Sequence, residues 1–444
     1  MSRHKLARQT ALLSGTHFIV RLMGFALRIW LSRELGAQAM GLVELAQSAQ
    51  MLLISPVVSG LPAAVSRLSA QRSRDGALRV ARYGVRLSLL FSLPLMLAAF
   101  LLREPLARWM GDIRTLPALL CFLPCIPLLG VSCALNGYFY GTGRPLPPAL
   151  SELVEQVVRV LLCLRLVPMM RSWPTTLRAA VPAAATLAGE TAGLVLMLAA
   201  LLLSALRHAQ VDAAAARGPG IYRELISLAL PLTGVRLVSS LMHTVNAALI
   251  PARLQVSGLA AQEALSRFGM LHGMALPVLM APSFITGSLS MVTAPELARR
   301  QAGGKPLRAL VRRVLLSTLC IGLPAMAAVW LLAPIVAENL YRQAELLPLL
   351  RLTCPLVPVM ALSQVCAGMM NGLGLQRRSL RISLAANLAA LLTTYLLAAQ
   401  PALRLTGAAI GMAAGQLVSM ALSLRALRRG ASDAEPTPPE CNAG

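Results

Sequence analysis

The sequence predicts an all-α integral membrane protein with about twelve transmembrane helices, arranged in two parallel six-helix repeats around a central cavity. Composition, the spacing of apolar runs and a likeness between the halves predict it. Of 444 residues, 57% are hydrophobic and 13% are charged, whereas soluble domains are about 25% charged. Mean hydropathy is +0.68. The chain has room for about a dozen spans of ~20 residues each, and for no separate soluble domain.

Apolar runs, separated by charged or Gly/Pro-containing breaks, define the expected helices. They lie at residues 10–33, 41–66, 78–102, 115–140, 148–170, 178–205, 225–250, 264–295, 308–335, 345–370, 379–399 and 405–427. The longest polar interruption divides them six and six. The expected parts are an N-terminal six-helix lobe at 1–206, a cytoplasmic linker at 207–223, a C-terminal six-helix lobe at 224–429 and a disordered cytoplasmic tail at 430–444.

The two halves contain similar segments. "LSGTHFIVRLM" at 13–23 resembles "LTGVRLVSSLM" at 232–242, and "LPLMLAAFLLREP" at 93–105 resembles "LPAMAAVWLLAP" at 323–334. Six helices per half give both repeats the same orientation, so they are related by an axis along the membrane normal. Proteins built in this way commonly bind a substrate between the halves and expose it to each side of the membrane in turn.

Proline pairs interrupt the second and eighth expected helices. Pro56 and Pro62 lie in the former, and Pro277 and Pro282 in the latter. Because proline removes a backbone hydrogen bond, both helices are expected to bend. Bent helices suit moving gates, and static packing is the alternative interpretation.

The net charge of +24 reflects 41 basic residues, of which two are lysine. These residues are dispersed and form no recognised nucleic-acid motif, so a nucleic-acid partner is not expected. With the N-terminus in the cytoplasm, the inside segments carry 24 Lys and Arg and the outside segments about ten. By the positive-inside rule both termini are then cytoplasmic.

Signals for an enzyme or a metal centre are missing from the sequence. It contains no G-x-x-x-x-G-K-[ST], H-E-x-x-H or G-x-S-x-G motif, and its eight cysteines form no C-x-x-C pair. We therefore expect neither catalysis nor a cofactor or metal. Transport, if coupled, would use an ion gradient or the membrane potential.

Basic side chains are spaced along one face of the first expected helix. His17, Arg21, Gly24 and Arg28 follow one another at intervals of four, three and four residues, so they share a helix face. A charge in the membrane centre costs roughly 2.5–3.5 kcal/mol on insertion scales, and such residues usually face a protein interior or water. We expect Arg21 and Arg28 to line a cavity. Snorkelling of Arg28 to the outer headgroups is the alternative.

The seventh expected helix, the first of its half, carries a second polar stripe. Its members are Arg236, His243, Asn246 and Arg253, with Arg253 near the helix end, where snorkelling is the alternative. Two basic stripes facing one cleft would suit an anionic substrate. Arginine keeps its charge and its planar donor fork matches phosphate.

The fifth expected helix contains Glu152, Glu155 and Arg159. Glu155 and Arg159 are four residues apart and can form a local ion pair. The same residues are candidates for gating or for coupling to an ion such as Na+ or H+. All four aspartates lie in expected loops or the tail, so an intramembrane carboxylate must be a glutamate, and Glu44 and Glu190 are further candidates.

Four stretches resemble a known family of membrane exporters. They include "GLVELAQSAQMLLISPVVSGLPAAVSRLSAQ" and "LNGYFYGTGRPLPPALSELVEQVVRV", and lie at 24–42, 41–71, 135–160 and 272–290. They are similar to the stage V sporulation protein B and polysaccharide-exporter family. That family belongs to the multidrug/oligosaccharidyl-lipid/polysaccharide (MOP) flippase superfamily, which also contains the lipid II flippases. The resemblance covers nearly the whole chain in order.

This resemblance implies two six-helix lobes around a cationic cavity and movement of undecaprenyl-pyrophosphate-linked sugars across the bacterial plasma membrane. For this subfamily it implies a link to cell-wall or spore-cortex peptidoglycan. Basic positions of the family map onto Arg21, Arg28 and Arg67, and its glutamate-arginine pattern onto Glu155 and Arg159. Family members often have a carboxylate near Asn246, where this chain has an amide. Many also have two further C-terminal helices.

The sequence favours a flippase for an anionic lipid-linked glycan, with membrane lipids, a coupling ion and wall-synthesis enzymes as further partners. One alternative is an ion-coupled multidrug or small-solute exporter of the same superfamily. The few membrane carboxylates and the 4% aromatic content favour the flippase, since cationic drugs bind acidic and aromatic groups. A non-transporting membrane scaffold for wall synthesis is the third hypothesis.

Overall fold

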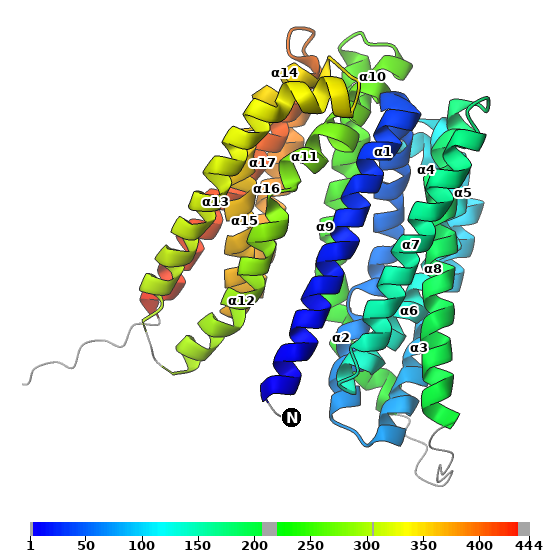
Figure 1. The fold of residues 1–444 in the computed structure, drawn as a ribbon, viewed down its shortest axis with the longest axis vertical. Coiled ribbons are helices and arrows are strands. Elements are labelled where there is room, and N and C mark those ends of the chain that lie inside the picture. The colour runs from blue at the N-terminus through cyan, green and yellow to red at the C-terminus, as the bar shows by residue number, and fades with distance from the viewer. Residues whose placement is uncertain (1–2, 207–219, 304–305, 434–444) are drawn as a thin grey trace, which may run out of the picture. The chain divides into compact units, whose positions relative to one another are not determined.

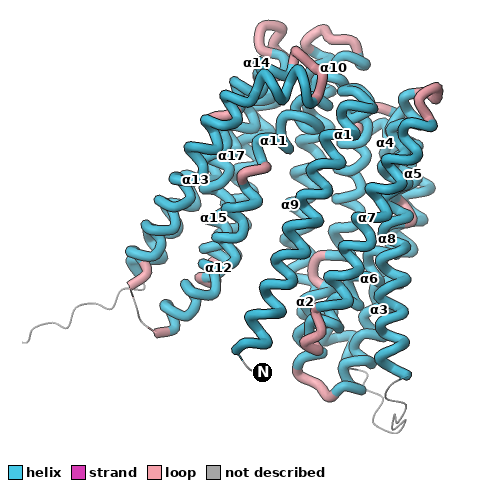
Figure 2. Tube along the Cα trace, viewed as in Figure 1, coloured by secondary structure: helices cyan, strands magenta, loops and turns pink. Residues whose placement is uncertain are grey.

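The computed structural model describes residues 3–206, 220–303 and 306–433. Within them the chain is helical and no strand occurs; Figure 2 shows helix along nearly its whole course, with loops as short connections. Contacts divide the chain into two compact units, Met1–Ala252 with Ala260–Gly273 and Arg253–Leu259 with Met274–Gly444. The lobe boundaries expected from the internal repeat stay a prediction, and residues 207–219 of the linker and 434–444 of the tail lie outside the described residues.

The first unit contains the helices of the first half, most of α9 and the beginning of the span after it (Figure 1). They are α1 (Arg3–Val58), α2 (Leu61–Ala70), α3 (Arg74–Leu101), α4 (Arg103–Trp109), η1 (Ile113–Thr115), α5 (Leu116–Phe122), α6 (Cys125–Gly141), α7 (Leu146–Met169), α8 (Thr175–Leu206), α9 (Gly220–Val256, to Ala252 here), α10 (Ala261–Phe268) and most of the π-helix η2 (Gly269–Ala275). Short α4 was not expected from the sequence.

The second unit continues with the remaining helices. They are α11 (Leu276–Met280), α12 (Ser283–Ala302), α13 (Arg308–Pro334), the π-helix η3 (Ile335–Leu340), α14 (Leu346–Thr353), α15 (Leu356–Gly372), α16 (Gln376–Leu397) and α17 (Arg404–Asp433). Helix α17 runs to Asp433, past the predicted end at residue 427 and into the segment expected to be a disordered tail. The other predicted spans agree with observed helices, or with consecutive helices, to within about seven residues at each end.

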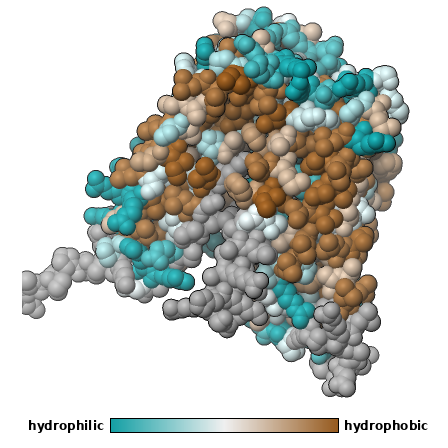
Figure 3. All heavy atoms as spheres, in the orientation of Figure 1, coloured by the Kyte–Doolittle hydropathy of each residue, from teal (hydrophilic) through white to brown (hydrophobic). Residues whose placement is uncertain are grey.

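The chain is a multi-pass membrane protein. Among the described residues, seven helices are long and apolar enough to cross a membrane, and an eighth is added if the bent pair α14–α15 counts as one span. Helix α7 is not among them because Glu152, Glu155 and Arg159 lie within it. On the face drawn in Figure 3, hydrophobic side chains cover the middle of the helices and hydrophilic ones gather near the helix ends.

Long α1 is two helices joined at Gly36, where the backbone has φ 79° and ψ 170°. This conformation is accessible to glycine and costly for other residues. In a straight helix, residues 16 positions apart are about 24 Å apart, yet the Arg28 and Glu44 side chains touch. The chain therefore reverses at Gly36, and the two arms correspond to the first and second predicted helices.

Prolines interrupt the spans as predicted. The second predicted helix breaks between α1 and α2 at Ser59 and Gly60, after Pro56, and the eighth is divided into α10, η2, α11 and α12, with Pro282 before α12. A further repeat links the two halves: Pro117, Pro124 and Pro127 recur at identical spacings as Pro348, Pro355 and Pro358. In each half these prolines divide one span into two helices, α5–α6 and α14–α15.

Equivalent glycines let equivalent helices approach closely in both halves. A Cβ at Gly141 would lie 2.4 Å from the carbonyl oxygen of Ser66, and one at Gly372 would lie 2.5 Å from that of Ala294. Shortly after each of these, Gly143 (φ 69°) and Gly374 (φ 73°) adopt the left-handed conformation. The α2–α6 contact of one half is thus repeated by the α12–α15 contact of the other.

Gly372→Ala is expected to lower the free energy of unfolding by about 1–3 kcal/mol, because the new methyl group would force α12 and α15 apart. Thermal unfolding in detergent micelles measures this. Gly234→Ala is the control, since no atom outside its own helix lies within 4 Å of that Cβ position; it should unfold at the same or a slightly higher temperature. Equal melting of Gly372→Ala and wild type would show that the helices are not closely packed there.

Candidate functional site: a charged cavity in the first unit

A cavity of about 330 Å³ lies inside the first unit, between both arms of α1 and helices α5, α6, α7 and α8. Its lining is apolar except for a group of polar and ionisable side chains. These are Arg28, Glu44, Gln47, Gln50, Gln156, Arg159, Thr186 and Glu190. Charged groups inside membrane helices are costly and usually mark functional positions, so this cavity is the candidate site.

Arg28 is held by groups from two other segments, the second arm of α1 and η2. Its Nη2 donates to a Glu44 carboxylate oxygen and, at 3.0 Å, to the carbonyl oxygen of His272. Its Nε donates to the carbonyl oxygen of Gly273 at 3.4 Å. The Arg28 side chain is 30% exposed and that of Glu44 14%. The guanidinium group is therefore neutralised and fixed, and it joins the arms of α1 to η2.

The carbonyl acceptors for Arg28 belong to the π-helix η2. Wider π-helical turns alter the backbone hydrogen-bond ladder and often occur at functional sites. The Ser32 hydroxyl also donates to the carbonyl oxygen of Gly273, at 3.4 Å. Close packing makes this approach possible: a Cβ at Gly269 would lie 1.9 Å from the carbonyl oxygen of Ala37.

Arg159 on α7 lies between two carboxylates. Its Nη2 is 2.5 Å from Glu155 Oε1 and 3.9 Å from Glu190 Oε1, and its Nη1 donates to Gln156 Oε1 at 3.3 Å. Glu190, on α8, is 8% exposed. One guanidinium group thus serves two acidic groups, which leaves this cluster with an excess of negative charge when both are ionised.

Each arginine around the cavity has an acidic partner. Arg28 faces Glu44, and Arg159 faces Glu155 and Glu190. Sequence reasoning named Glu44 and Glu190 as carboxylates within the spans, but it could not pair them with particular arginines. It missed Gln156 and the carbonyl groups of η2 altogether, since neither has a recognisable signal in the sequence.

The other predicted residues of α1, α2 and α7 lie apart from these two clusters. His17 Nδ1 is 2.8 Å from Glu152 Oε2, a contact that joins α1 to α7. Arg21 and Arg67 are exposed on α1 and α2. Gly24 lines the cavity, so one face of α1 carries the His17 contact, Gly24 and Arg28.

The predicted polar stripe of α9 is distributed over both units. Arg236 and His243 are exposed and Asn246 is half-buried in the first unit, whereas Arg253 belongs to the second. Arg253 donates from Nε to the carbonyl oxygen of Tyr395 at 2.9 Å, and its guanidinium carbon lies 4.0 Å from the centre of the Tyr395 ring.

A family model described as "polysaccharide biosynthesis protein" matches residues 6–301. The chain belongs to the polysaccharide biosynthesis protein family. Two Bacillus subtilis (strain 168) proteins resemble it. Stage V sporulation protein B is 25% identical over 433 residues, covering 94% of this chain and 82% of that protein. Sporulation protein YkvU is 22% identical over 427 residues, covering 94% of each.

Solved structures show that this family member has the fold of MOP-superfamily transporters. An inward-facing multidrug resistance MATE family transporter superimposes with a TM-score of 0.74 at 19% identity, covering 94% of this chain and 98% of that one. An outward-facing MATE structure gives a TM-score of 0.67 and covers 97% of this chain and 96% of that one. The two-repeat, twelve-helix fold predicted from the sequence agrees with the fold of these structures.

Proposed function

We propose that the protein is a flippase that moves undecaprenyl-pyrophosphate-linked oligosaccharide, a peptidoglycan or polysaccharide precursor, across the bacterial plasma membrane by alternating access. The match of residues 6–301 to the polysaccharide biosynthesis family carries the proposal, and the transporter fold supports it. A role in cell-wall or spore-cortex synthesis follows from the similarity to two sporulation proteins.

The guanidinium groups within the spans support an anionic cargo. Arg28 and Arg159 line a cavity although burial of charge is costly, and a pyrophosphate could exchange with their glutamate partners through paired hydrogen bonds. We propose that the residues contacting substrate are Arg21, Arg28, Arg67, Arg236, His243, Asn246 and Arg253.

Gating or coupling is proposed for the α7 carboxylates and their partner. Glu152 contacts His17, and Glu155 contacts Arg159. A change in protonation or Na+ occupancy at either pair would alter the contacts of α7 with α1 and α8. We further propose that both termini are cytoplasmic, which the distribution of Lys and Arg supports. The two six-helix lobes are the proposed moving parts.

An ion-coupled multidrug or small-solute exporter is the second candidate. Three carboxylates against two arginines around one cavity favour it, because excess negative charge attracts cations. A scaffold that recruits wall-synthesis enzymes is the third. It requires no transport, so loss of transport with retained recruitment would distinguish it.

The test is transport by wild-type protein in proteoliposomes, with and without proton or Na+ gradients. The proposal predicts movement of a fluorescent undecaprenyl-pyrophosphate glycan and little movement of a cationic dye. Dye export without glycan movement would replace the flippase with the exporter. Movement of neither cargo by folded protein would favour the scaffold.

A further inference from the structure

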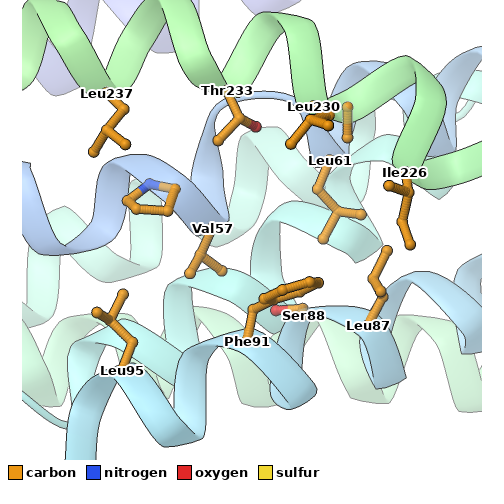
Figure 4. A pocket seen from close by; sticks show the side chains of 12 residues that line it. Val57, Leu61, Leu87, Ser88, Phe91, Leu95, Ile226, Leu230, Thr233 and Leu237 are labelled. Atoms are coloured by element: carbon orange, nitrogen blue, oxygen red, sulfur yellow. The ribbon is translucent and has the colours of Figure 1, made fainter. Parts of the chain in front are cut away.

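A second cavity in the first unit has a different character. It measures about 390 Å³ and is lined by residues of α1, α2, α3 and α9. The two cavities share helix α1, but no lining residue. Figure 4 shows Leu61, Leu87, Phe91 and Leu230 turned toward one another around it. The only hydroxyl-bearing members of the lining are Ser88 and Thr233.

The break in the second span creates this space. Helix α1 ends at Val58, and α2 begins at Leu61. Gly60 lies directly against α9, where its Cβ would be 2.1 Å from the carbonyl oxygen of Ala229. Further along, Ser240 and Thr244 of α9 donate to the α1 carbonyl oxygens of Met51 and Ser48. Helix α9 is thus fixed at two levels, and the apolar cavity lies beside it.

The cavity opens at the surface through apolar side chains. Phe91 is 57% exposed and Leu230 65%, although both line the cavity. An opening lined by such side chains suits the entry of a hydrocarbon chain. An apolar cavity of ~150 Å³ already admits small hydrocarbons, and this cavity is more than twice that size.

One end of the cavity carries aromatic and cationic groups. Tyr83 and Tyr222 lie one helical turn before the lining residues Leu87 and Ile226, with ring centres 4.8 Å apart in an edge-to-face contact. The guanidinium carbon of Arg86 lies 5.9 Å from the centre of the Tyr83 ring. Tyrosine is typical of the headgroup level of membranes, and an exposed arginine there complements a phosphate.

We propose that this cavity binds the part of the polyisoprenoid chain nearest the phosphate of the lipid-linked substrate, with the phosphate beside Arg86 and this part of the isoprenoid between α3 and α9. The inference rests on the proposed function, because it takes its ligand from that cargo. An apolar channel with a cationic end matches a long hydrocarbon carrying an anionic head. The isoprenoid would then be held by the first unit of the protein.

Photolabelling of the wild-type protein tests the proposal without requiring transport. The probe is undecaprenyl phosphate with a diazirine in its isoprenoid chain, incorporated with the protein in proteoliposomes. Adducts are expected within residues 85–95 and 226–237. An excess of unlabelled undecaprenyl phosphate should prevent these adducts, and the same amount of phosphatidylglycerol should not. Adducts confined to other helices, or equal competition by phosphatidylglycerol, would overturn the proposal.

A filled cavity provides the matched variant. Thr233→Phe puts a large side chain into the lining and should reduce labelling of α3 about tenfold, equivalent to ~1.4 kcal/mol of binding free energy. Val238→Phe is the control, because it adds the same ring at an exposed position of α9 outside the lining. Its α3 should be photolabelled to the same extent as in wild type. Similar labelling of both variants would contradict the assignment. Labelling without glycan transport would count against the flippase function alone, and transport without labelling against the chain site alone.

Discussion

Arg28→Ala is expected to abolish glycan transport and to lower the free energy of unfolding by about 3 kcal/mol. Removal of one member of a buried ion pair leaves its partner charged without compensation, at a cost of about 3–5 kcal/mol. Here Glu44 would lose its guanidinium partner, and the carbonyl oxygens of His272 and Gly273 would lose a donor. Thermal unfolding in detergent and transport at equal incorporation in proteoliposomes measure the two effects separately.

The double variant Arg28→Gln/Glu44→Gln separates stability from function. It removes both charges and keeps side chains that can hydrogen-bond, so its free energy of unfolding should return to within about 1 kcal/mol of wild type. Transport should remain lost, because no guanidinium group is available to the pyrophosphate. Arg33→Gln is the control, since Arg33 is exposed on the same helix. Normal transport by the double variant would remove Arg28 from the substrate site.

Arg159→Gln is expected to have the second largest effect. Glu155 and Glu190 would then face one another without a cation between them, and repulsion between buried carboxylates costs several kcal/mol unless one binds a proton. Both the unfolding temperature and transport should fall sharply. Differential scanning fluorimetry at neutral pH and the proteoliposome assay measure them.

Adding Glu190→Gln to Arg159→Gln should restore much of the stability, because a single carboxylate then remains. Arg165→Gln is the matched control on the same helix, where the arginine is exposed and an exposed charge contributes about 0–1 kcal/mol. If Arg165→Gln destabilised the protein as much as Arg159→Gln, the charge cluster of α7 and α8 would not be the cause.

Much of the fold could be predicted because each span is long, apolar and bounded by breaks. Helix α8, expected at 178–205, is observed at Thr175–Leu206. Internal interruptions were harder to predict. The prolines predicted a bend in the eighth span, but not the π-helix η2, which begins at Gly269 where the chain packs closely against α1. The reversal at Gly36 was implied only by the gap between two apolar runs.

The site could be predicted only in part. Helical spacing placed Arg28 with Gly24 on one face and Glu155 beside Arg159, since these relations are local to one helix. The partners Glu44 and Glu190 come from a chain reversal and from a neighbouring helix, and no local pattern specifies such contacts. Arg21, one turn before Gly24, is exposed in the structure, and its expected place in a cavity stays a prediction.

The most direct test of the central claim is the rate of fluorescent undecaprenyl-pyrophosphate glycan translocation by wild type and by Arg28→Gln/Glu44→Gln. Both proteins should be reconstituted at equal density, after thermal unfolding has shown that both are folded. A rapid rate for wild type and a background rate for the folded double variant is the expected result. Equal rates, or no translocation by folded wild type under any ion gradient, would contradict a flippase that binds its anionic cargo through the arginines of this cavity.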